Sequence, residues 1–346
     1  MDAFAEKIVA IAVTLIRMPL NPGKALCLIY LTSALVIALT VLWLRARAQG
    51  RPSIKGVLSE LFPRRVWWHR SARVDYMYLL VNSFVAVLIF APVLLSTPVI
   101  ANGTAIVLEQ VFGAQGPALA PTLGAQALLA LALVVALDLG FFVAHYLMHR
   151  VGWLWEFHKV HHSAEVLTPV TNHRSHPVQS IVFGTLIAGL SGIVLGIFDY
   201  TFDYDLTALQ ILGVNAAFFV FMAVSLNLQH SHVWISFGAL DRIFVSPAMH
   251  QVHHSVDARH LGKNLGAVFS VWDALAGTRY LPDGIEELRL GLGDGEEAEF
   301  QSVARLYAIP FRNVIRRART WVKTRDPASA GAKLTTDART SRIGIR

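Results

Sequence analysis

Two short segments of the chain carry three histidines each in the same order. The pattern HxxHH occurs as "HKVHH" at residues 158–162 and as "HQVHH" at residues 250–254, and "HYLMH" at residues 145–149 precedes the first. In a helix, positions i, i+3 and i+4 project from one face, so each segment would present its imidazoles together. Imidazole is a ligand for Zn, Cu, Fe and Ni. The pattern therefore predicts a metal-binding site made of histidines.

The number of histidines indicates two metal ions close together, because one ion takes only about four to six ligands. Structural zinc would form closed four-coordinate sites and would draw on cysteine. The chain has one cysteine, Cys27, inside an apolar run. Iron with an open position is the better match, because it can bind and activate O₂.

The composition predicts a membrane protein. Of the 346 residues, 54% are hydrophobic and 15% are charged, against roughly 25% charged in soluble domains. A run of about 20 apolar residues crosses a bilayer as a helix. Five runs predict spans, at residues 26–44, 76–100, 122–137 with its continuation through Asp138, 178–198 and 206–228. The predicted fold class is an all-α integral membrane protein with about four or five transmembrane helices.

Charges in the short loops predict the side on which the histidines lie. The loop between the first two runs holds eight Lys and Arg residues, with Glu60 as the only acid before Asp75. The next loop, residues 101–121, has no Lys or Arg. Basic short loops face the cytoplasm, so residues 145–177 and those after about 229 are predicted to be cytoplasmic. The histidine segments can then meet in a cytoplasmic His-rich cap over two metals.

The two ends of the chain differ from its apolar middle. Residues 3–23 mix apolar and charged side chains and are predicted to lie along the membrane interface. Residues 311–325 are basic with interleaved apolar side chains, which favours an amphipathic helix on anionic lipid over nucleic-acid binding. Residues after about 326 are predicted to be disordered. Three regions follow: a membrane/interfacial segment with a basic loop (1–70), a central domain (71–285) and a basic tail (286–346).

At family level the chain resembles the fatty acid hydroxylase/sterol desaturase superfamily. The resemblance runs from "SARVDYMY" (71–78) to about residue 285, through "HYLMHR", "HKVHHS", "NHRSHP", "HQVHHS" and "SVWDALAGTRYLP". It implies a membrane-bound, non-haem di-iron oxygenase that uses O₂ and electrons from a separate donor protein. Such an enzyme hydroxylates or desaturates a C–H bond of a lipid. The lipid, whether sterol, fatty acyl chain or another class, stays open.

The resemblance also implies the metal ligands. Nine histidines match the family pattern: His145, His149, His158, His161, His162, His230, His250, His253 and His254. Four further residues are predicted to bind a metal or to orient a ligand: His176, His173, His232 and Asp138. His176 ranks above His173, because Pro177 restrains its backbone next to the fourth apolar run. His69 and His260 are predicted to be ordinary surface histidines.

The chain departs from its relatives at two positions after the third histidine segment. Leu265 lies in "NLG" where relatives often have Asn-Tyr-Gly, and Ala276 stands where they often have Phe. We expect both positions near the mouth of the substrate site and without contact to a ligand.

Two other functions stay open. A membrane transporter or metal-handling protein would carry ionisable residues along a path inside its spans, where Asp138 is the main one here. A zinc-dependent lipid hydrolase needs a single metal site with a bound water, and this chain has more histidines than such a site uses. Metal analysis of the purified protein distinguishes these alternatives.

Overall fold

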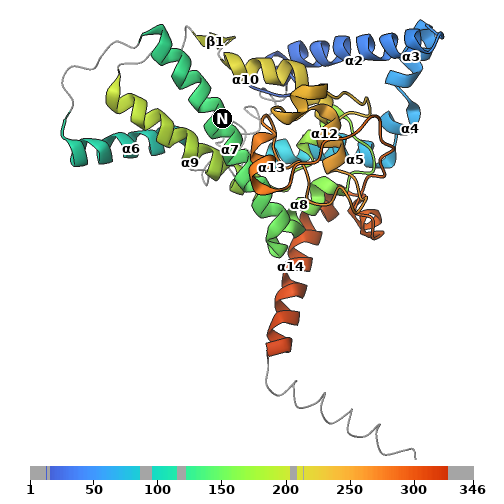
Figure 1. Ribbon diagram of the computed structural model, residues 1–346. Helices are drawn as coiled ribbons and strands as arrows, with labels where there is room; N and C mark the ends of the chain where they lie inside the picture. The colour runs from blue at the N-terminus through green and yellow to red at the C-terminus, as the bar shows by residue number, and fades with distance from the viewer. Residues whose placement is uncertain are drawn as a thin grey trace, which may run out of the picture.

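The computed structural model describes residues 13, 16–85, 96–114, 122–202, 209–212 and 214–325. Over these ranges the protein is mostly helical, which confirms the predicted fold class (Figure 1). Their only sheet is a short antiparallel hairpin, in which β1 (Gln210–Ile211) pairs with β2 (Val214–Asn215).

Three helices are long and apolar enough to cross a membrane. They are α2 (Leu28–Ala48), α7 (Leu123–Arg150) and α9 (Pro177–Thr201), and they correspond to the first, third and fourth predicted spans. The start of α7 is set by Thr122, whose Oγ1 accepts a hydrogen bond from the N–H of Ala125. α9 begins at Pro177, whose missing N–H costs nothing in the first helical turn. The protein is an integral membrane protein.

The fifth predicted span has a different structure, and the second is described only in part. In the run 76–100, α5 (Arg70–Val85) ends before the segment 86–95, which lies outside the described residues, and α6 (Thr97–Phe112) begins after it. The run 206–228 contains the hairpin and then a short apolar helix over Ala216–Gln229. That helix comprises α10 (Ala216–Phe221), a π-helical turn (Met222–Leu226) and α11 (Asn227–Gln229).

The segment predicted as the loop 101–121 is largely helical, because α6 continues to Phe112 and packs along α9. Glycines of α9 allow this approach. A Cβ on Gly192 would lie 2.7 Å from Cβ of Ile100 and 2.9 Å from the carbonyl oxygen of Thr97. On the other side of α9, a Cβ on Gly140 of α7 would lie 2.9 Å from Cα of Ile187. Small residues let membrane helices pack closely without a hydrophobic driving force between them.

The remaining helices form the cap that carries the histidines. α8 (Gly152–His162) follows α7 after one residue, and α12 (Pro247–His253) begins where Oγ of Ser246 accepts from the N–H of Met249. α13 (Val271–Ala276) ends at Gly277, which is left-handed with φ 71°. Shorter elements complete the described chain: α3 (Ile54–Leu61), α4 (Arg64–Trp67) and the 3₁₀ turns Met18–Leu20, Pro169–His173, Gly238–Arg242 and Glu296–Phe300.

The C-terminal helix α14 (Val303–Arg325) confirms that the basic segment is helical. Its first half is part of the core, where Leu306 and Ile309 pack with Tyr78, Val160 and Phe300. From Ile315 to Trp321 every residue is exposed, and this half extends away from the body of the protein (Figure 1). The predicted disordered tail after residue 325, and most of the predicted interfacial segment 3–23, lie outside the described residues.

The packing of α6 on α9 generates a testable prediction. Replacing Gly192 by Val should force the two helices apart and cost roughly 1–3 kcal/mol of stability, the usual effect of overpacking. Thermal unfolding of the purified protein would measure this as a lower midpoint. Gly189→Val is the matched control, because a Cβ on Gly189 of the same helix meets nothing within 4 Å. Equal midpoints for the two variants would contradict the close packing.

Candidate metal centre

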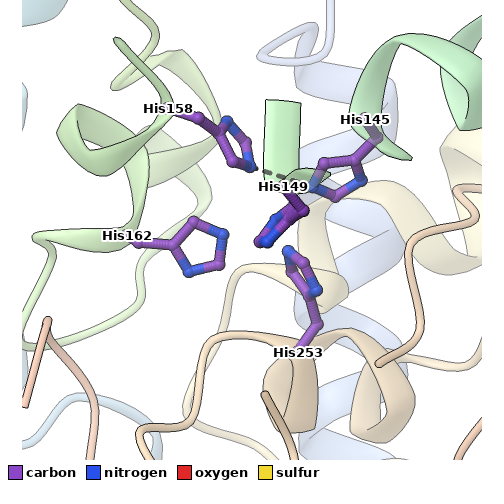
Figure 2. Close-up of side chains that lie close together, drawn as sticks. All are labelled: His145, His149, His158, His162 and His253. Atoms are coloured by element: carbon purple, nitrogen blue, oxygen red, sulfur yellow. Dashed lines mark hydrogen bonds between the residues drawn. The ribbon is translucent and has the colours of Figure 1, made fainter. Parts of the chain in front are cut away.

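Nine histidines gather in two adjacent groups inside the cap. One group has five members, His145, His149, His158, His162 and His253, and the other has four, His161, His230, His250 and His254. Within each group the potential ligand atoms all lie within 4.8 Å of one another. Figure 2 shows the rings of the first group pointing toward a common centre. These are the nine residues that the sequence singles out, and the structure brings all of them together.

Each HxxHH segment contributes to both groups. From α8, the rings of His158 and His162 lie in the five-membered group, whereas His161 lies in the four-membered group. From α12 and its C-terminal end, His253 joins the first group, and His250 and His254 join the second. Because both helices serve both groups, the two groups have to form together.

The Nε2 atoms face one another within the groups. Nε2 of His145 lies 3.0 Å from Nε2 of His158 in the first group. In the second, Nε2 of His230 lies 3.2 Å from Nε2 of His161 and 3.0 Å from Nε2 of His250. In addition, Nε2 of His149, His162 and His253 is buried and has no hydrogen-bond partner among the described residues. Buried polar atoms normally have a partner, so inward-facing nitrogens of this kind fit metal ligands.

Hydrogen bonds on the opposite ring nitrogens orient three rings of the first group. Nδ1 of His145 lies 2.7 Å from the carbonyl oxygen of Leu265, and Nδ1 of His253 lies 2.8 Å from that of Lys263. Nδ1 of His158 lies 3.0 Å from Oε1 of Gln179 on α9. Since a carbonyl oxygen only accepts, each Nδ1 carries the proton, and each Nε2 keeps its lone pair free for a metal.

The loop that supplies these carbonyls is itself held by buried side chains. The carboxylate of Asp273 accepts from the N–H groups of Leu265 and Gly266, each at 2.8 Å. Nδ2 of Asn264 donates to the carbonyl oxygen of Met249, and Asn264 has φ 55°, a left-handed conformation that Asn tolerates better than most residues. The expectation that Leu265 contacts no ligand is wrong. The contact uses its backbone, so the side-chain departure from the family leaves it intact.

Asp138 does not contact a histidine, contrary to the prediction that it orients a ligand directly. Its carboxylate accepts from the N–H groups of Val268 and Phe269 at 2.8 and 2.9 Å, and from Nε1 of Trp272 at 2.9 Å. It thereby fixes the chain that follows Leu265. Asp138 acts on His145 only through this loop.

The other candidate histidines lie outside both groups. His176 caps α9, where its Nδ1 accepts from the N–H of Val178, and its ring packs on Phe157. Nε2 of His232 lies 2.9 Å from the carbonyl oxygen of Glu60. His173 lies at the end of the 3₁₀ turn Pro169–His173, and its Nε2 is buried without a partner among the described residues. Neither His176 nor His173 belongs to a histidine group, so the ranking of His176 above His173 stays a prediction.

The two histidines predicted to lie on the surface differ from each other. His69 is half-buried, and its Nδ1 accepts from the N–H of Ser71. His260 is only 1% exposed, and its Nε2 lies 3.1 Å from Oε2 of Glu286. The prediction for His260 is therefore wrong, because the ring is covered by Tyr280.

Burial keeps the clustered imidazoles neutral. It lowers the pKa of His158 to about 3 and that of His253 to about 4. Burial, reinforced by neighbouring histidines, also holds the pKa values of five others well below the ordinary value, those of His161, His162, His230, His250 and His254. Neutral imidazole is the form that binds metal.

A buried ion pair that sequence reasoning did not identify fixes α8 in place. Arg174 is fully buried, and its Nη1 donates to Oδ1 of Asp75 at 2.8 Å. Its Nε donates to the carbonyl oxygen of Val160, and its Nη2 donates to Oγ of Ser163, both at 2.8 Å. Two features of the sequence could have indicated this pair: Arg174 is a charged residue inside the "NHRSHP" motif, and Asp75 is a charged residue at the start of the apolar run 76–100.

Comparison with known proteins gives a consistent set of relatives. Residues 130–278 match the family model described as fatty acid hydroxylase, and this region contains both histidine groups. The ornithine lipid hydroxylase OlsE of Rhizobium tropici is 32% identical over 155 residues, which cover 44% of this chain and 41% of the relative. The alkylglycerol monooxygenase of Homo sapiens is 28% identical over 145 residues, covering 42% and 29%.

A third relative is the Delta(7)-sterol 5(6)-desaturase of Eremothecium gossypii, 26% identical over 157 residues, covering 45% of this chain and 39% of the relative. The chain thus spans less than half the length of each of these three curated relatives. No solved structure matches it significantly.

The contribution of the Arg174–Asp75 ion pair to stability can be tested by substitution. Arg174→Met should destabilise the protein by roughly 3–5 kcal/mol, because it leaves the Asp75 carboxylate buried without its cation. Replacing both partners, as in D75L/R174M, removes the uncompensated charge and should recover much of the loss. Thermal unfolding of the three proteins measures both effects. A double variant no more stable than R174M would show that the pair is not what links α5 to α8.

Proposed function

The chain belongs to the fatty acid hydroxylase/sterol desaturase superfamily, and on this premise we propose that it is a membrane-bound di-iron oxygenase. It uses O₂ to hydroxylate or desaturate a C–H bond of a lipid. The observation that carries the proposal is the pair of adjacent, buried, all-histidine groups with five and four members. Neither group contains a carboxylate or a thiolate, and imidazole is a suitable ligand for iron.

The residues present fit two metal ions on three grounds. First, the inward-facing Nε2 atoms converge within each group. Second, three of these atoms are buried without a hydrogen-bond partner among the described residues. Third, the lowered pKa values of His158 and His253, which lie outside the membrane-spanning helices, favour neutral imidazole rings. Nine ligands divided five and four leave coordination positions for O₂ on ions that take about six ligands. A single closed zinc site would use four.

Within this proposal the histidines hold the metals, and iron supplies the binding and activation of O₂. The chain's own residues do the rest. The carbonyl oxygens of Leu265 and Lys263 fix the ring orientation of His145 and His253. Met148, Val160 and Val252, each next to a ligand in the sequence, are fully buried, so the helices that carry the ligands are packed against the protein and not against water. In a hydroxylation, one O₂, two electrons and two protons convert C–H to C–OH and release one water.

The substrate is a lipid. By their names, the relatives act on ornithine lipid, alkylglycerol and a sterol, which share long apolar hydrocarbon. An apolar cavity of about 210 Å³ lies between α2 and the segment around His230, lined by Leu31, Ala34, Leu228, Val233 and neighbouring residues. Its lining suits an alkyl chain or a sterol ring and offers no charged group.

The proposed site lies on the cytoplasmic side and receives electrons from a separate protein. Support comes from the basic loop after α2, which favours the cytoplasm under the positive-inside rule. It also comes from the composition of the two histidine groups, which combine residues before α9 with residues after α11. These segments can share two metal sites only if they emerge on the same side of the membrane. A lipid hydroxylation needs two electrons that neither the lipid nor O₂ supplies, so a reductant is required.

Metal content tests the proposal. The purified protein should contain two irons per chain, and His161→Ala and His253→Ala should each lower that number and abolish product formation from a lipid extract. His253 belongs to the five-membered group and His161 to the four-membered group, so the two variants probe the groups separately. His232→Ala is the control, because its ring lies outside both groups. One zinc per chain would instead indicate the hydrolase, and full activity in either ligand variant would exclude the assignment.

Site-directed labelling tests the topology. In a Cys27→Ser background, cysteine at Leu275, which is 77% exposed on α13 of the cap, should react with an impermeant maleimide from the cytoplasmic side only. Cysteine at Gly124, at the opposite end of α7 and exposed, should react from the other side only. Labelling of both positions from the same side would contradict the proposed orientation.

A further inference from the structure

A second apolar cavity lies between the span α7 and the cap. Its volume is about 460 Å³, which is within the usual range of ligand-binding cavities, about 300–1,000 Å³. One wall is α7, through Leu131 and Val134, and the facing wall is α10, which packs on α7. Val268 and Phe269, in the loop after Leu265, form its end. None of the nine clustered histidines lines it.

The position of the cavity on α7 places its opening in the hydrocarbon of the membrane. Leu131 and Val134 lie eight and 11 residues after the first residue of α7, about 12 and 17 Å along the helix axis. The hydrocarbon of a bilayer is about 30 Å thick, so both residues lie well inside it. Leu131 is 53% exposed on α7, and Val220 is 55% exposed on α10. The cavity therefore opens to lipid chains between these two helices.

The lining of the cavity fits a hydrocarbon. Among the described residues that form it, Ser225 is the only polar one, and the others are Ala, Val, Leu and Phe. Oγ of Ser225 already donates to the carbonyl oxygen of Val245. Water inside would find few hydrogen-bond partners, and apolar cavities of this kind stay dry. Because the cavity opens to lipid chains, a hydrocarbon chain is the occupant that enters without losing hydrogen bonds.

Asp138 separates the cavity from the metal centre. Val134, Asp138 and His145 share one face of α7, because they are spaced by four and seven residues. The carboxylate of Asp138 accepts from the N–H groups of Val268 and Phe269, so the end of the cavity is bonded to α7 between Val134 and His145. These two residues are 11 positions apart, about 17 Å along the helix axis. A chain that ends at Val268 and Phe269 is therefore kept away from the histidines.

We propose that this cavity binds one acyl chain of a bilayer phospholipid, at a site separate from that of the substrate. The chain enters between α7 and α10 and ends against Val268 and Phe269. There it packs on the loop whose Leu265 carbonyl oxygen orients His145. The phospholipid supports the metal centre in this way and takes no part in the reaction. The proposal does not depend on which reaction the metals catalyse.

Photo-cross-linking of the full chain in nanodiscs can locate the acyl chain. The nanodiscs would contain phosphatidylcholine with a diazirine near the end of one acyl chain, and mass spectrometry would map the adducts after irradiation. Val134 and Val268 should be labelled although they are only 4% and 7% exposed, because a chain inside the cavity reaches them. Leu129 is the matched control: it is buried on α7 but does not line the cavity, and it should stay unlabelled.

Filling the cavity with a protein side chain should exclude the acyl chain. Val220→Trp places an indole at the opening, and it should lose most of the adducts at Val134 and Val268. Adducts at Leu128, which is exposed on α7 outside the cavity, should remain as in the wild type. Val99→Trp makes the same change at an exposed position of α6 that does not line the cavity, and all its adducts should match the wild type.

Three results would overturn the proposal. The first is a wild type labelled at Leu128 but not at Val134 and Val268, which would show that lipid stays outside the cavity. The second is the same adduct yield at Val134 and Val268 in Val220→Trp and Val99→Trp. The third is oxidised phosphatidylcholine after the iron-loaded protein has been given dithionite and O₂, which would make the bound chain a substrate. A protein without oxygenase activity would still give the adducts, so the proposed function is tested separately.

Discussion

Nine imidazole rings can share one buried volume only if each stays neutral and turns a nitrogen lone pair inward. A proton on any ring would place a charge in a region without counter-ions, which is why burial lowers the pKa of His158 to about 3. Lone pairs that face each other at 3.0 Å, as between His145 and His158, gain nothing from one another unless a proton or a cation lies between them. The arrangement therefore favours a metal in place of the missing protons, and metal binding contributes to folding.

Other groups in the structure orient the imidazole rings by hydrogen bonding to Nδ1, the ring nitrogen that faces away from the metal centre. Leu265 and Lys263 present carbonyl oxygens to two rings, and Asp273 and Asp138 hold the loop between them and α13. These two carboxylates bind backbone N–H groups, so they position ligands without contacting them. On the other side of the site Arg174 fixes the end of α8. Both arrangements place charged groups inside the protein: the two carboxylates accept hydrogen bonds from N–H groups, and Arg174 is paired with Asp75.

Much of the candidate site follows from the sequence because it is local. Spacing within HxxxH and HxxHH decides which rings share a helical face, and α7, α8 and α12 form as this periodicity requires. The division of each HxxHH between two groups does not follow, since it depends on the angle at which α8 and α12 meet. The same holds for Asp138, which faces the loop at Val268 because of tertiary packing that its sequence neighbours do not encode.

The membrane spans, too, could be predicted from the sequence only in part. Apolar runs correctly give α2, α7 and α9, because length and hydropathy suffice for a helix that crosses lipid. The segment 206–228 has the same composition but forms a hairpin followed by a short helix with a π-turn. Its end has to deliver His230 to the second group, between His161 and His250. A π-turn changes the direction of the following residues, and no hydropathy pattern predicts it.

The two groups differ in how their outer nitrogens are bound, and this makes them chemically unequal. In the five-membered group Nδ1 of His145, His158 and His253 has a protein acceptor. In the four-membered group all four Nδ1 atoms are buried without a hydrogen-bond partner among the described residues. A hydrogen bond at Nδ1 raises the basicity of Nε2 and restrains the ring. The first group is therefore the more rigid and the more strongly donating of the two.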